Sequence, residues 1–363
     1  MAALFLYGTL RDAELFSIVA GEGAGRARPA RLPGWAAERV MGVDLPMLVR
    51  REGAAAEGLL WEGLDEARRA RLDRFELPWG YRLGEALVEV EGGAVPAEVY
   101  LPPEEQTSTG TPWSLAAWQA GDAPRIRLAA AEMAAHEPPL PPEELRRQWR
   151  MMEVRADAQL RAAREPAPTT LRHSPAPGDF TLRASAPPHG SFFKLSGLDI
   201  AHRRFDGGRE TGVPREVFTG TDAALVLPHD PDTGLVLMVE QFRPGPAKRG
   251  DPNPWVLEPV AGIIDPGETP KAAARREAEE EAGVTLTSLR HLFSFYPSPG
   301  TNTDFFHCYA GETRLEKEDL WYGGLEEERE DIRVHVVSLE RALGLVRSGE
   351  INIGPLIAML MAL

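Results

Sequence analysis

The sequence predicts an α+β protein of two domains, and three observations lead to this prediction. The chain has 363 residues, which is more than one domain usually contains. The segment 165–190 is rich in proline and small residues, as linkers are. Short apolar runs and helical stretches occur on both sides of it. We therefore expect a domain at 1–110, a helical extension at 111–164, the linker, and a second domain at 191–363.

Composition limits the possible partners. The net charge of −15 and the pI near 5.1 argue against a general binder of nucleic acid or membrane surfaces. The single cysteine, Cys308, excludes an internal disulfide and indicates a reducing compartment. The first residues do not resemble a signal peptide, and no apolar run is long enough to span a membrane. We expect a soluble cytoplasmic protein with a small-molecule substrate, no nucleic acid and no membrane.

The first domain begins with an apolar run, Leu4 to Tyr7, which predicts a buried strand that ends at the turn-like Gly8-Thr9. Residues 65–75 have helical composition, and the pattern from 113 to 164 is helical as well. Further strands are expected at 55–61, 86–90 and 97–101. This mixture predicts an α+β domain.

The second domain has a strong hairpin signal. Two apolar runs, 223–228 and 235–240, are joined by the sequence HDPDTG. Residues 255–261 lead directly into a helical stretch. Other strands are expected at 192–205, 215–219, 289–296, 305–310 and 332–338, with final helices at 340–347 and 355–363. Strands on both sides of a central helix predict a mixed sheet between helices.

That central helix lies in residues 262–284, GIIDPGETPKAAARREAEEEAGV. Thr269 suits an N-cap, and Pro270 fits the first helical turn. Residues 271–282 are rich in Ala, Arg and Glu, which are strong helix formers. Gly283 supplies a stop. The stretch therefore predicts a helix with defined ends.

Three carboxylates share one face of this helix, because Glu277, Glu280 and Glu281 are spaced i, i+3, i+4. They repel each other unless a cation lies among them, and hard oxygen ligands suit Mg²⁺ or Mn²⁺. Arg276, four residues before Glu280, is placed to orient one of them. The alternative, a solvated acidic helix, does not account for the fixed spacing of Glu268 and the glycines around these residues.

The stretch follows the pattern G-x5-E-x7-R-E-U-x-E-E-x-G-U, where U is apolar and Ala278 takes the first U position. It thus resembles the Nudix box. The resemblance implies an α/β/α Nudix sandwich for the C-terminal domain. It also implies metal-dependent hydrolysis of a diphosphate, with Mg²⁺ or alternatively Mn²⁺ as the cofactor.

From Phe192 to the C-terminus the chain resembles bacterial ADP-ribose pyrophosphatases. The stretches that carry this resemblance are Arg215–Phe218, Glu240–Arg243, Trp255–Gly262, Ser298–Gly300 and Glu326–Asp331. It implies hydrolysis of ADP-ribose, or a related nucleoside diphosphate sugar, to AMP and ribose 5-phosphate. It also implies a homodimer.

The same resemblance assigns roles to residues. The implied metal ligands are the Ala261 carbonyl, Glu277, Glu280, Glu281 and Glu330. Among them Glu277 and Glu281 are the first choices, and they count as catalytic for that reason. Glu328 is the implied general base, which takes a proton from the attacking water. The alternative for the segment around Glu328 is a solvated acidic loop.

The implied substrate contacts are Arg215, Glu216, Arg243, Ser298, Gly300 and Asp304. Arg243 suits a phosphate because a guanidinium forks onto two oxygens. Arg215 and Glu216 match residues that contact the adenosine end or the terminal ribose, partly across a dimer interface; the alternative is a surface ion pair. Asp304 stands where the family often has Glu, so the charge is kept and the reach is one methylene shorter.

At the other end of the chain, residues 6–10, LYGTL, resemble the YGTL or YGSN loop of the γ-glutamylcyclotransferase-like fold. Residues 58–61 and 72–76, followed by Tyr81, match further segments, and the resemblance covers 3–102. It implies a mixed β-barrel/α domain with Glu76 as general acid/base. The backbone N–H groups implied to bind a carboxylate are those of Tyr7, Gly8, Thr9 and Leu10.

Two interpretations of this domain stay open. It is an active γ-glutamyl cyclotransferase, or it has a structural or binding role. The chain has Leu77 where the family has glycine after the glutamate, with Pro78-Trp79 inserted. A further alternative for the protein is an ADP-ribose-binding sensor, although such sensors usually lose a box glutamate. The tandem order resembles bacterial fusion proteins linked to tellurite resistance.

Overall fold

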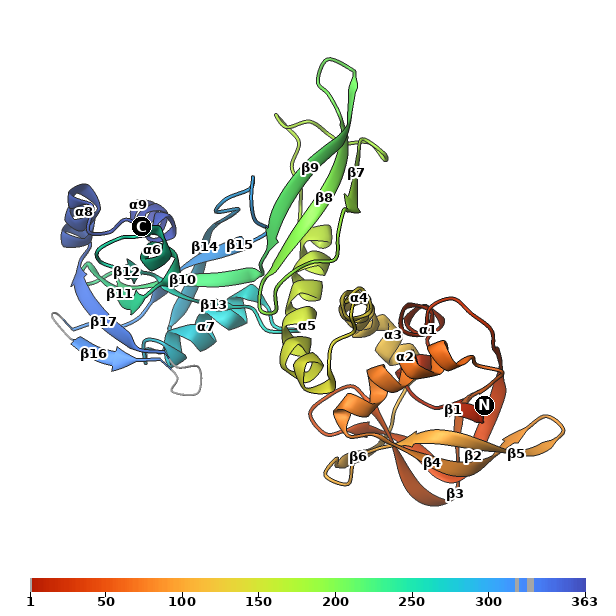
Figure 1. Cartoon of the computed structure of the whole chain (residues 1–363). Coiled ribbons are helices and arrows are strands. Elements are labelled where there is room, and N and C mark those ends of the chain that lie inside the picture. Colours follow the sequence, from red (N-terminus) through yellow and green to blue (C-terminus); the bar gives the residue numbers. More distant parts are fainter. Residues whose placement is uncertain (1, 317–319, 325–329) are drawn as a thin grey trace. The chain divides into compact units, whose positions relative to one another are not determined.

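The computed structural model describes residues 2–316, 320–324 and 330–363 (Figure 1). Its contacts divide the chain into two compact units, Met1–Pro168 and Thr169–Leu363. This division falls inside the segment 165–190 that the prolines mark as a linker. Part of that segment, Phe180–Ala184, forms strand β7, because its backbone pairs with β8 (Lys194–Arg203).

The N-terminal unit is built on a closed sheet. Over residues 2–168 the strand order is β3-β1-β5-β4-β2-β6, and β2 also pairs with β3, so the sheet closes into a barrel. The strands are β1 (Ala3–Leu6), β2 (Arg26–Val40), β3 (Pro46–Glu62), β4 (Arg82–Val90), β5 (Gly93–Leu101) and β6 (Ser108–Pro112). β1 and β5 are parallel, and the pairs on either side of them are antiparallel. The mixed β-barrel/α prediction is confirmed.

Alternation along β1 separates two cores, because successive side chains of a strand point to opposite faces. Leu4 and Leu6 pack beneath the helices, whereas Phe5 and Tyr7 belong to the core inside the barrel. The helices of this unit are α1 (Ala13–Ala20), α2 (Glu66–Glu76), α3 (Leu115–Ala120), α4 (Ala123–Ala134) and α5 (Pro142–Arg164), with 3-10 turns η1 (Thr9–Arg11) and η2 (Leu77–Trp79). The loop that begins at Tyr7 therefore follows β1 directly and leads through η1 into α1.

The C-terminal unit is a sandwich. In its described part the sheet order is β14-β15-β10-β11-β17-β16, with β12 on β11 and β13 on β10. Ala273, Ala274 and Ala278 of α7 (Pro270–Glu280) are fully buried against one face, and α8 (Leu339–Ser348) and α9 (Gly354–Ala362) pack on the other. The predicted α/β/α sandwich is confirmed. Small alanines allow α7 to lie close to the sheet.

The remaining bounds of this unit are β9 (Arg209–Thr219), β10 (Asp222–Asp230), β11 (Leu235–Phe242), α6 (Pro244–Arg249), β12 (Trp255–Glu258), β13 (Val260–Ile263), β14 (Ser288–Phe295), β15 (Phe305–Glu312), β16 (Leu320–Gly323) and β17 (Ile332–Ser338). β7, β8 and β9 form a separate antiparallel sheet. Among the described residues, no helix is long and apolar enough to cross a membrane.

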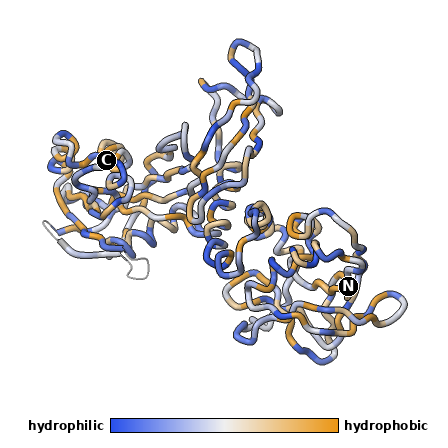
Figure 2. Tube along the Cα trace, in the orientation of Figure 1, coloured by the Kyte–Doolittle hydropathy of each residue, from blue (hydrophilic) through white to orange (hydrophobic). Residues whose placement is uncertain are grey.

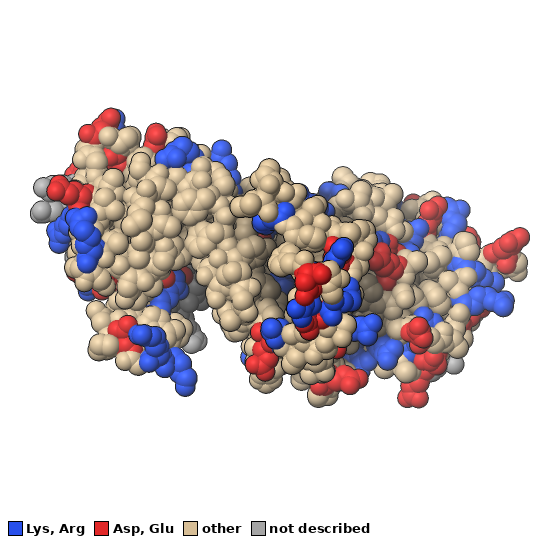
Figure 3. All heavy atoms as spheres, turned by 90° about the horizontal axis from the view of Figure 1, so that it is seen from above, with Lys and Arg blue, Asp and Glu red and all other residues tan. Residues whose placement is uncertain are grey.

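The hydropathy of the residues varies along each element of both units. Figure 2 shows hydrophobic and hydrophilic residues alternating along the strands and helices of each unit. On the face seen in Figure 3, basic and acidic side chains are interspersed.

Candidate active site

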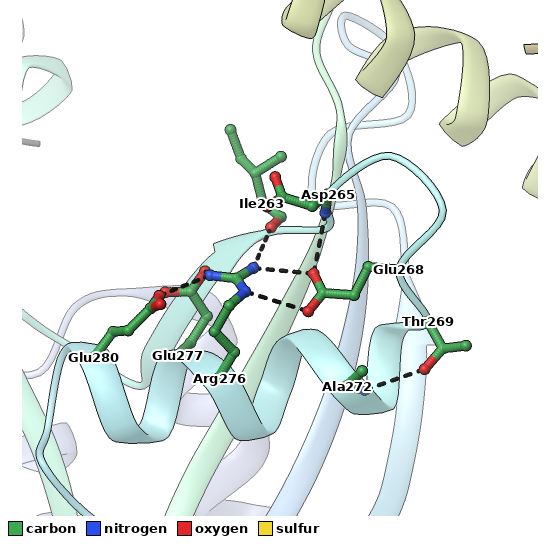
Figure 4. A network of polar contacts seen from close by, with 8 residues as sticks. All are labelled: Ile263, Asp265, Glu268, Thr269, Ala272, Arg276, Glu277 and Glu280. Carbon is green, nitrogen blue, oxygen red and sulfur yellow. Dashed lines mark hydrogen bonds and ion pairs between the residues drawn. The ribbon is translucent and has the colours of Figure 1, made fainter. Parts of the chain in front are cut away.

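The acidic face of α7 is organised by one arginine. Arg276 Nη1 donates to Glu277 Oε1 at 2.6 Å and to Glu280 Oε2 at 2.8 Å (Figure 4). Its Nε and Nη2 donate to the two carboxylate oxygens of Glu268, at 3.2 and 3.0 Å, and Nη2 also donates to the Ile263 carbonyl at 3.1 Å. Arg276 therefore fixes three carboxylates and ties the loop before α7 to β13.

The ends of α7 are set as the sequence predicts. Thr269 Oγ1 accepts a hydrogen bond from the Ala272 N–H at 3.2 Å, which confirms the N-cap. Gly283 has φ +64°, a left-handed conformation that favours glycine, and its N–H donates to the Glu279 carbonyl. The helix proper ends at Glu280, and Glu281 is its C-cap.

Two glutamates of the box face strand β13. Glu281 Oε2 accepts a hydrogen bond from the Ala261 N–H at 3.0 Å. A Cβ atom at Gly262 would lie 1.8 Å from Glu277 Oε1, so only glycine leaves room for that carboxylate. Space, rather than backbone conformation, explains the first glycine of the box.

These two carboxyl groups are also the most desolvated of the site. Glu277 is 9% exposed and Glu281 is 2% exposed. Burial raises the pKa of Glu277 to about 7 against the attraction of Arg276, and the charges of Glu280 and Glu330 raise it further. Burial raises the pKa of Glu281 to about 8, with Glu277 and Glu330 adding to the rise. Such a cluster of carboxyl groups favours a bound cation.

The predicted ligand atoms are of the chemical type that binds a hard divalent metal ion. The predicted ligands offer carboxylate oxygens and one carbonyl oxygen, which are the ligands Mg²⁺ prefers. Glu330 lies near enough to Glu277 and Glu281 to affect both pKa values. Within the described part of the chain, however, no three acidic, His or Cys side chains are arranged around a metal position, and Arg276 holds Glu277 and Glu280. The predicted base, Glu328, lies outside the described residues.

Arg243 stands at the edge of this cluster. Its Nε donates to Glu258 Oε2 at 2.6 Å, and its positive charge lowers the pKa of Glu281. Burial raises the pKa of Glu258, and Arg243 opposes that rise. Glu258 is not among the site residues predicted from the sequence, although it holds Arg243. The available signal was a single acidic residue inside the otherwise apolar stretch WVLEPVAG.

The Ser298-Pro299-Gly300 loop connects β14 with β15. Ser298 Oγ lies 2.7 Å from Thr301 Oγ1, and the Ser298 carbonyl accepts from the Thr301 N–H at 3.1 Å. The Phe218 N–H of β9 donates to the Thr301 carbonyl at 2.8 Å. Gly300 lies at the exposed tip. The loop is therefore pinned to the end of β9.

Asp304 holds the base of that loop. Its Oδ1 accepts from the Thr221 N–H at 3.2 Å, and its Oδ2 accepts from Asn302 Nδ2 at 3.0 Å. A Cβ atom at Gly220 would lie 1.6 Å from Asp304 Oδ1. This carboxylate is thus engaged by its own loop and by the start of β10, a role that its spacing in the sequence did not suggest.

Arg215 and Glu216 lie exposed on β9, opposite Leu198 and Gly197 of β8. Arg215 Nη1 donates to the carbonyl of Pro214 at 2.8 Å. Among described residues neither side chain forms an ion pair, so the alternative of a surface ion pair is not seen. The structure does not bring these two residues into contact with the box.

A second cluster lies in the N-terminal unit, at the end of α2. Desolvation raises the pKa of Glu76 to about 7. Tyr81 Oη donates to the Pro46 carbonyl at 3.4 Å. Burial raises the pKa of both Tyr7 and Tyr81, and the charge of Glu76 adds to the rise. Glu76 therefore lies near enough to the loop that starts at Tyr7 to affect the pKa of Tyr7.

The loop itself is compact. Thr9 and Leu10 are buried in η1, and the Gly8 carbonyl accepts from the Arg11 N–H at 3.0 Å. A Cβ atom at Gly8 would lie 2.8 Å from Pro46 Cγ, so the strand β3 passes very close to it. The inserted residues after Glu76 form η2, which packs on α5 through Trp79 and Trp149. The insertion thus adds a contact with the helical extension.

The box helix, its arginine network and the sheet that carries them are those of a Nudix hydrolase domain. Residues 220–358 match the family described as NUDIX domain, and the chain belongs to the Nudix family. Residues 4–120 match the family described as Gamma-glutamyl cyclotransferase, AIG2-like. Both families that the sequence resembles are therefore found, in the predicted order.

Named relatives align with the Nudix part. An ADP-ribose pyrophosphatase from Haemophilus influenzae is 39% identical over 165 residues, which are 45% of this chain and 76% of that protein. One from Escherichia coli is 40% identical over 161 residues, 44% of this chain and 76% of that protein. A GDP-mannose pyrophosphatase from Salmonella arizonae is 34% identical over 172 residues, 47% of this chain and 87% of that protein.

Proposed function

We propose that the C-terminal domain hydrolyses the diphosphate bond of ADP-ribose, or of a related nucleoside diphosphate sugar. Its products from ADP-ribose are AMP and ribose 5-phosphate. One observation carries the proposal: two buried carboxyl groups of the box, Glu277 and Glu281, face β13. Gly262 leaves space for the Glu277 carboxylate, and the Ala261 N–H donates a hydrogen bond to Glu281. The named relatives act on ADP-ribose or GDP-mannose, which supports this substrate class.

The residues divide into three roles. Glu277, Glu280, Glu281 and Glu330, with the Ala261 carbonyl, are the proposed ligands of Mg²⁺ or, alternatively, Mn²⁺. When bound, such a metal neutralises the diphosphate and lowers the pKa of water. Glu328 is the proposed general base, which takes the proton from the water that attacks phosphorus while the bridging P–O bond breaks. Arg276 orients Glu277 and Glu280 before any ligand binds.

Substrate contacts surround this centre. Arg243 is proposed to bind a phosphate through the guanidinium nitrogens that Glu258 does not hold. Ser298 and Gly300 are proposed to contact the substrate from the loop, and Asp304 supports them from its base. Arg215 and Glu216 are proposed to bind the adenosine or terminal ribose end of a substrate held by the partner subunit of a homodimer.

The first experiment measures AMP release from ADP-ribose with Mg²⁺, beside ADP-glucose, GDP-mannose and NADH. Metal-dependent release that is lost in Glu281→Gln supports the reaction and the site together. Preference for another of these diphosphates would support the proposed reaction and assign a different substrate. No turnover of any of them, with ADP-ribose still bound, would overturn the proposal in favour of an ADP-ribose sensor.

We also propose a cytoplasmic homodimer. The sheet β7-β8-β9 supports the dimer, because large apolar side chains are exposed on it and directly before β8: Phe180, Leu182, Phe193, Leu195 and Phe218 are each at least 39% exposed. Phe193 and Phe218 also contact each other, with ring centroids 4.9 Å apart. Light scattering after size exclusion tests the dimer, and Phe218→Ser should weaken it.

A second candidate activity is a γ-glutamyl cyclotransferase in the N-terminal unit. The observation in its favour is Glu76, a carboxyl group with a pKa near neutrality beside the Tyr7 loop. Such a group suits proton transfer as an amine closes on a γ-carbonyl. Release of 5-oxoproline from γ-glutamyl amines, lost in Glu76→Gln while AMP release is unchanged, would support this activity. Release that persists in Glu76→Gln would contradict it.

A further inference from the structure

A cavity of about 230 Å³ lies within the N-terminal unit, where α1 and α2 meet the segment from α4 to α5. Its apolar wall includes Val19, Met133 and Leu145, of which Val19 and Leu145 are buried. Arg71, Arg74 and His136 also line it. The cavity therefore combines an apolar wall with three basic side chains.

The basic side chains are unusual for this chain. Asp and Glu number 55 against 40 Lys and Arg, yet no described residue that lines the cavity is acidic. Arg71 and Arg74 are three residues apart on α2, so they share one helical face. Arg74 makes no hydrogen bond or ion pair with another described residue. Its charge is thus available to a ligand.

Arg71 is held in position by the end of α1. Its Nη1 donates to the Ala20 carbonyl at the end of α1, at 3.2 Å. Gly21 follows with φ +70°, and a Cβ atom there would lie 2.1 Å from Arg71 Nη1. The glycine therefore leaves space for the guanidinium, whose other nitrogens keep free donor capacity.

The cavity is separate from both sites described above. Glu76 and the loop at residues 7–10 do not line it. The match to the AIG2-like family ends at residue 120, whereas α4 begins at Ala123. Met133, His136 and Leu145 thus come from the helical extension beyond that match. The extension creates this cavity by covering α1 and α2.

We propose that the cavity binds a small organic acid with an apolar body. Its carboxylate pairs with Arg74 and Arg71, with His136 nearby, and its body contacts Val19, Met133 and Leu145. A guanidinium forks onto the two oxygens of a carboxylate. The volume of about 230 Å³ lies below the ~300–1,000 Å³ of sites for drug-sized ligands, so the ligand is small.

The test is calorimetric titration of the full chain with octanoate, beside 1-octanol and acetate. We expect saturable binding of octanoate, at least about tenfold tighter than binding of either control, because both the charge and the apolar body contribute. Arg74→Gln should weaken octanoate binding by about tenfold or more, since it removes a hydrogen bond to a charged group. Arg164→Gln, an exposed arginine of α5 outside the cavity, is the matched control and should change nothing.

A second variant tests the location. Ala134 lines the cavity and is exposed, so Ala134→Phe fills the cavity without removing a core side chain. It should abolish octanoate binding while thermal unfolding stays unchanged. Absence of octanoate binding, equal binding of 1-octanol, or octanoate binding unchanged by both Arg74→Gln and Ala134→Phe would each overturn the proposal.

Discussion

Each unit contains a carboxyl group whose pKa lies near 7, Glu277 buried and Glu76 half-buried, and the charges around the two groups differ. Glu277 sits among Arg276, Glu280 and Glu330, so its charge state depends on a network of charges. Glu76 sits beside tyrosines, and desolvation alone raises its pKa. Burial is thus the main cause of the raised pKa of both groups, and only at Glu277 do neighbouring charges modify it.

The difference indicates different chemistry. A cluster of repelling carboxylates organised by one arginine is suited to a divalent cation, which neutralises several of them at once. A single desolvated carboxyl group is suited to holding and releasing one proton. Similar pKa values thus do not imply similar roles.

The largest effect is expected from Glu281→Gln. The amide keeps the size of the side chain and an oxygen for the Ala261 N–H, but it removes a proposed metal-binding charge. We expect AMP release from ADP-ribose to fall on the order of a thousandfold, with unchanged thermal unfolding. Glu279→Gln, exposed on the same helix, is the matched control. Equal losses in the two variants would contradict a specific role for Glu281.

The second effect is a pH dependence of stability in the N-terminal unit. The pKa of Glu76 rises from 4.5 to about 7 on folding, so the folded state holds the proton more tightly. The stabilisation is fully present below pH 4.5 and is lost as the pH rises through about 7. The shift corresponds to at most about 3 kcal/mol, because the side chain is only partly buried.

Hydrogen exchange of peptides from residues 1–168 measures this effect without interference from the other unit. Wild-type protection should decrease between pH 5 and pH 8 once the intrinsic exchange rate is corrected. Glu76→Gln cannot ionise, so its unfolding free energy should vary less across this range. Parallel profiles for the two proteins would show that the Glu76 carboxyl group is not desolvated in the fold.

The sequence predicted the elements that have strong local signals. The box helix has an N-cap, strong helix formers and a stop glycine, and its predicted and observed ends agree closely. β2 was missed because its prolines and arginines conceal the strand pattern. A register shift between Pro33 and Trp35 relieves this conflict, and the long pairing with β3 stabilises the strand. That pairing is not local in the sequence.

Prediction of the active site from the sequence had the same limit, because contacts between distant segments could not be foreseen. Spacing alone placed Glu277, Glu280 and Glu281 on one face, because a helix has a fixed period. It did not show that Glu258 holds Arg243, nor that Asp304 binds the Thr221 N–H. These contacts join segments that are distant in the sequence, and they depend on how the strands pair.

The third effect is expected from Gly262→Ala. The new methyl group would lie 1.8 Å from Glu277 Oε1, so the Glu277 side chain must move away from β13. We expect AMP release to fall by about 30-fold, smaller than for Glu281→Gln because the carboxylate is displaced and not removed. Gly245→Ala is the control, since a Cβ atom there meets nothing within 4 Å. Full activity of Gly262→Ala would show that the position of the Glu277 carboxylate is unimportant.

The smallest effect is expected from variants of Asp304, which test whether this residue supports its loop or contacts the substrate. In Asp304→Asn the side-chain oxygen still accepts from the Thr221 N–H, while the new amide replaces the acceptor of Asn302 Nδ2. Asn302 Oδ1 has no hydrogen-bond partner among the described residues, so rotation of the Asn302 amide restores a pair. We therefore expect near-wild-type stability and less than a threefold change in kcat/KM.

Asp304→Ala leaves the Thr221 N–H unpaired and should lose about 1–2 kcal/mol of stability. A tenfold loss of kcat/KM in Asp304→Asn at unchanged stability would instead assign Asp304 to the substrate.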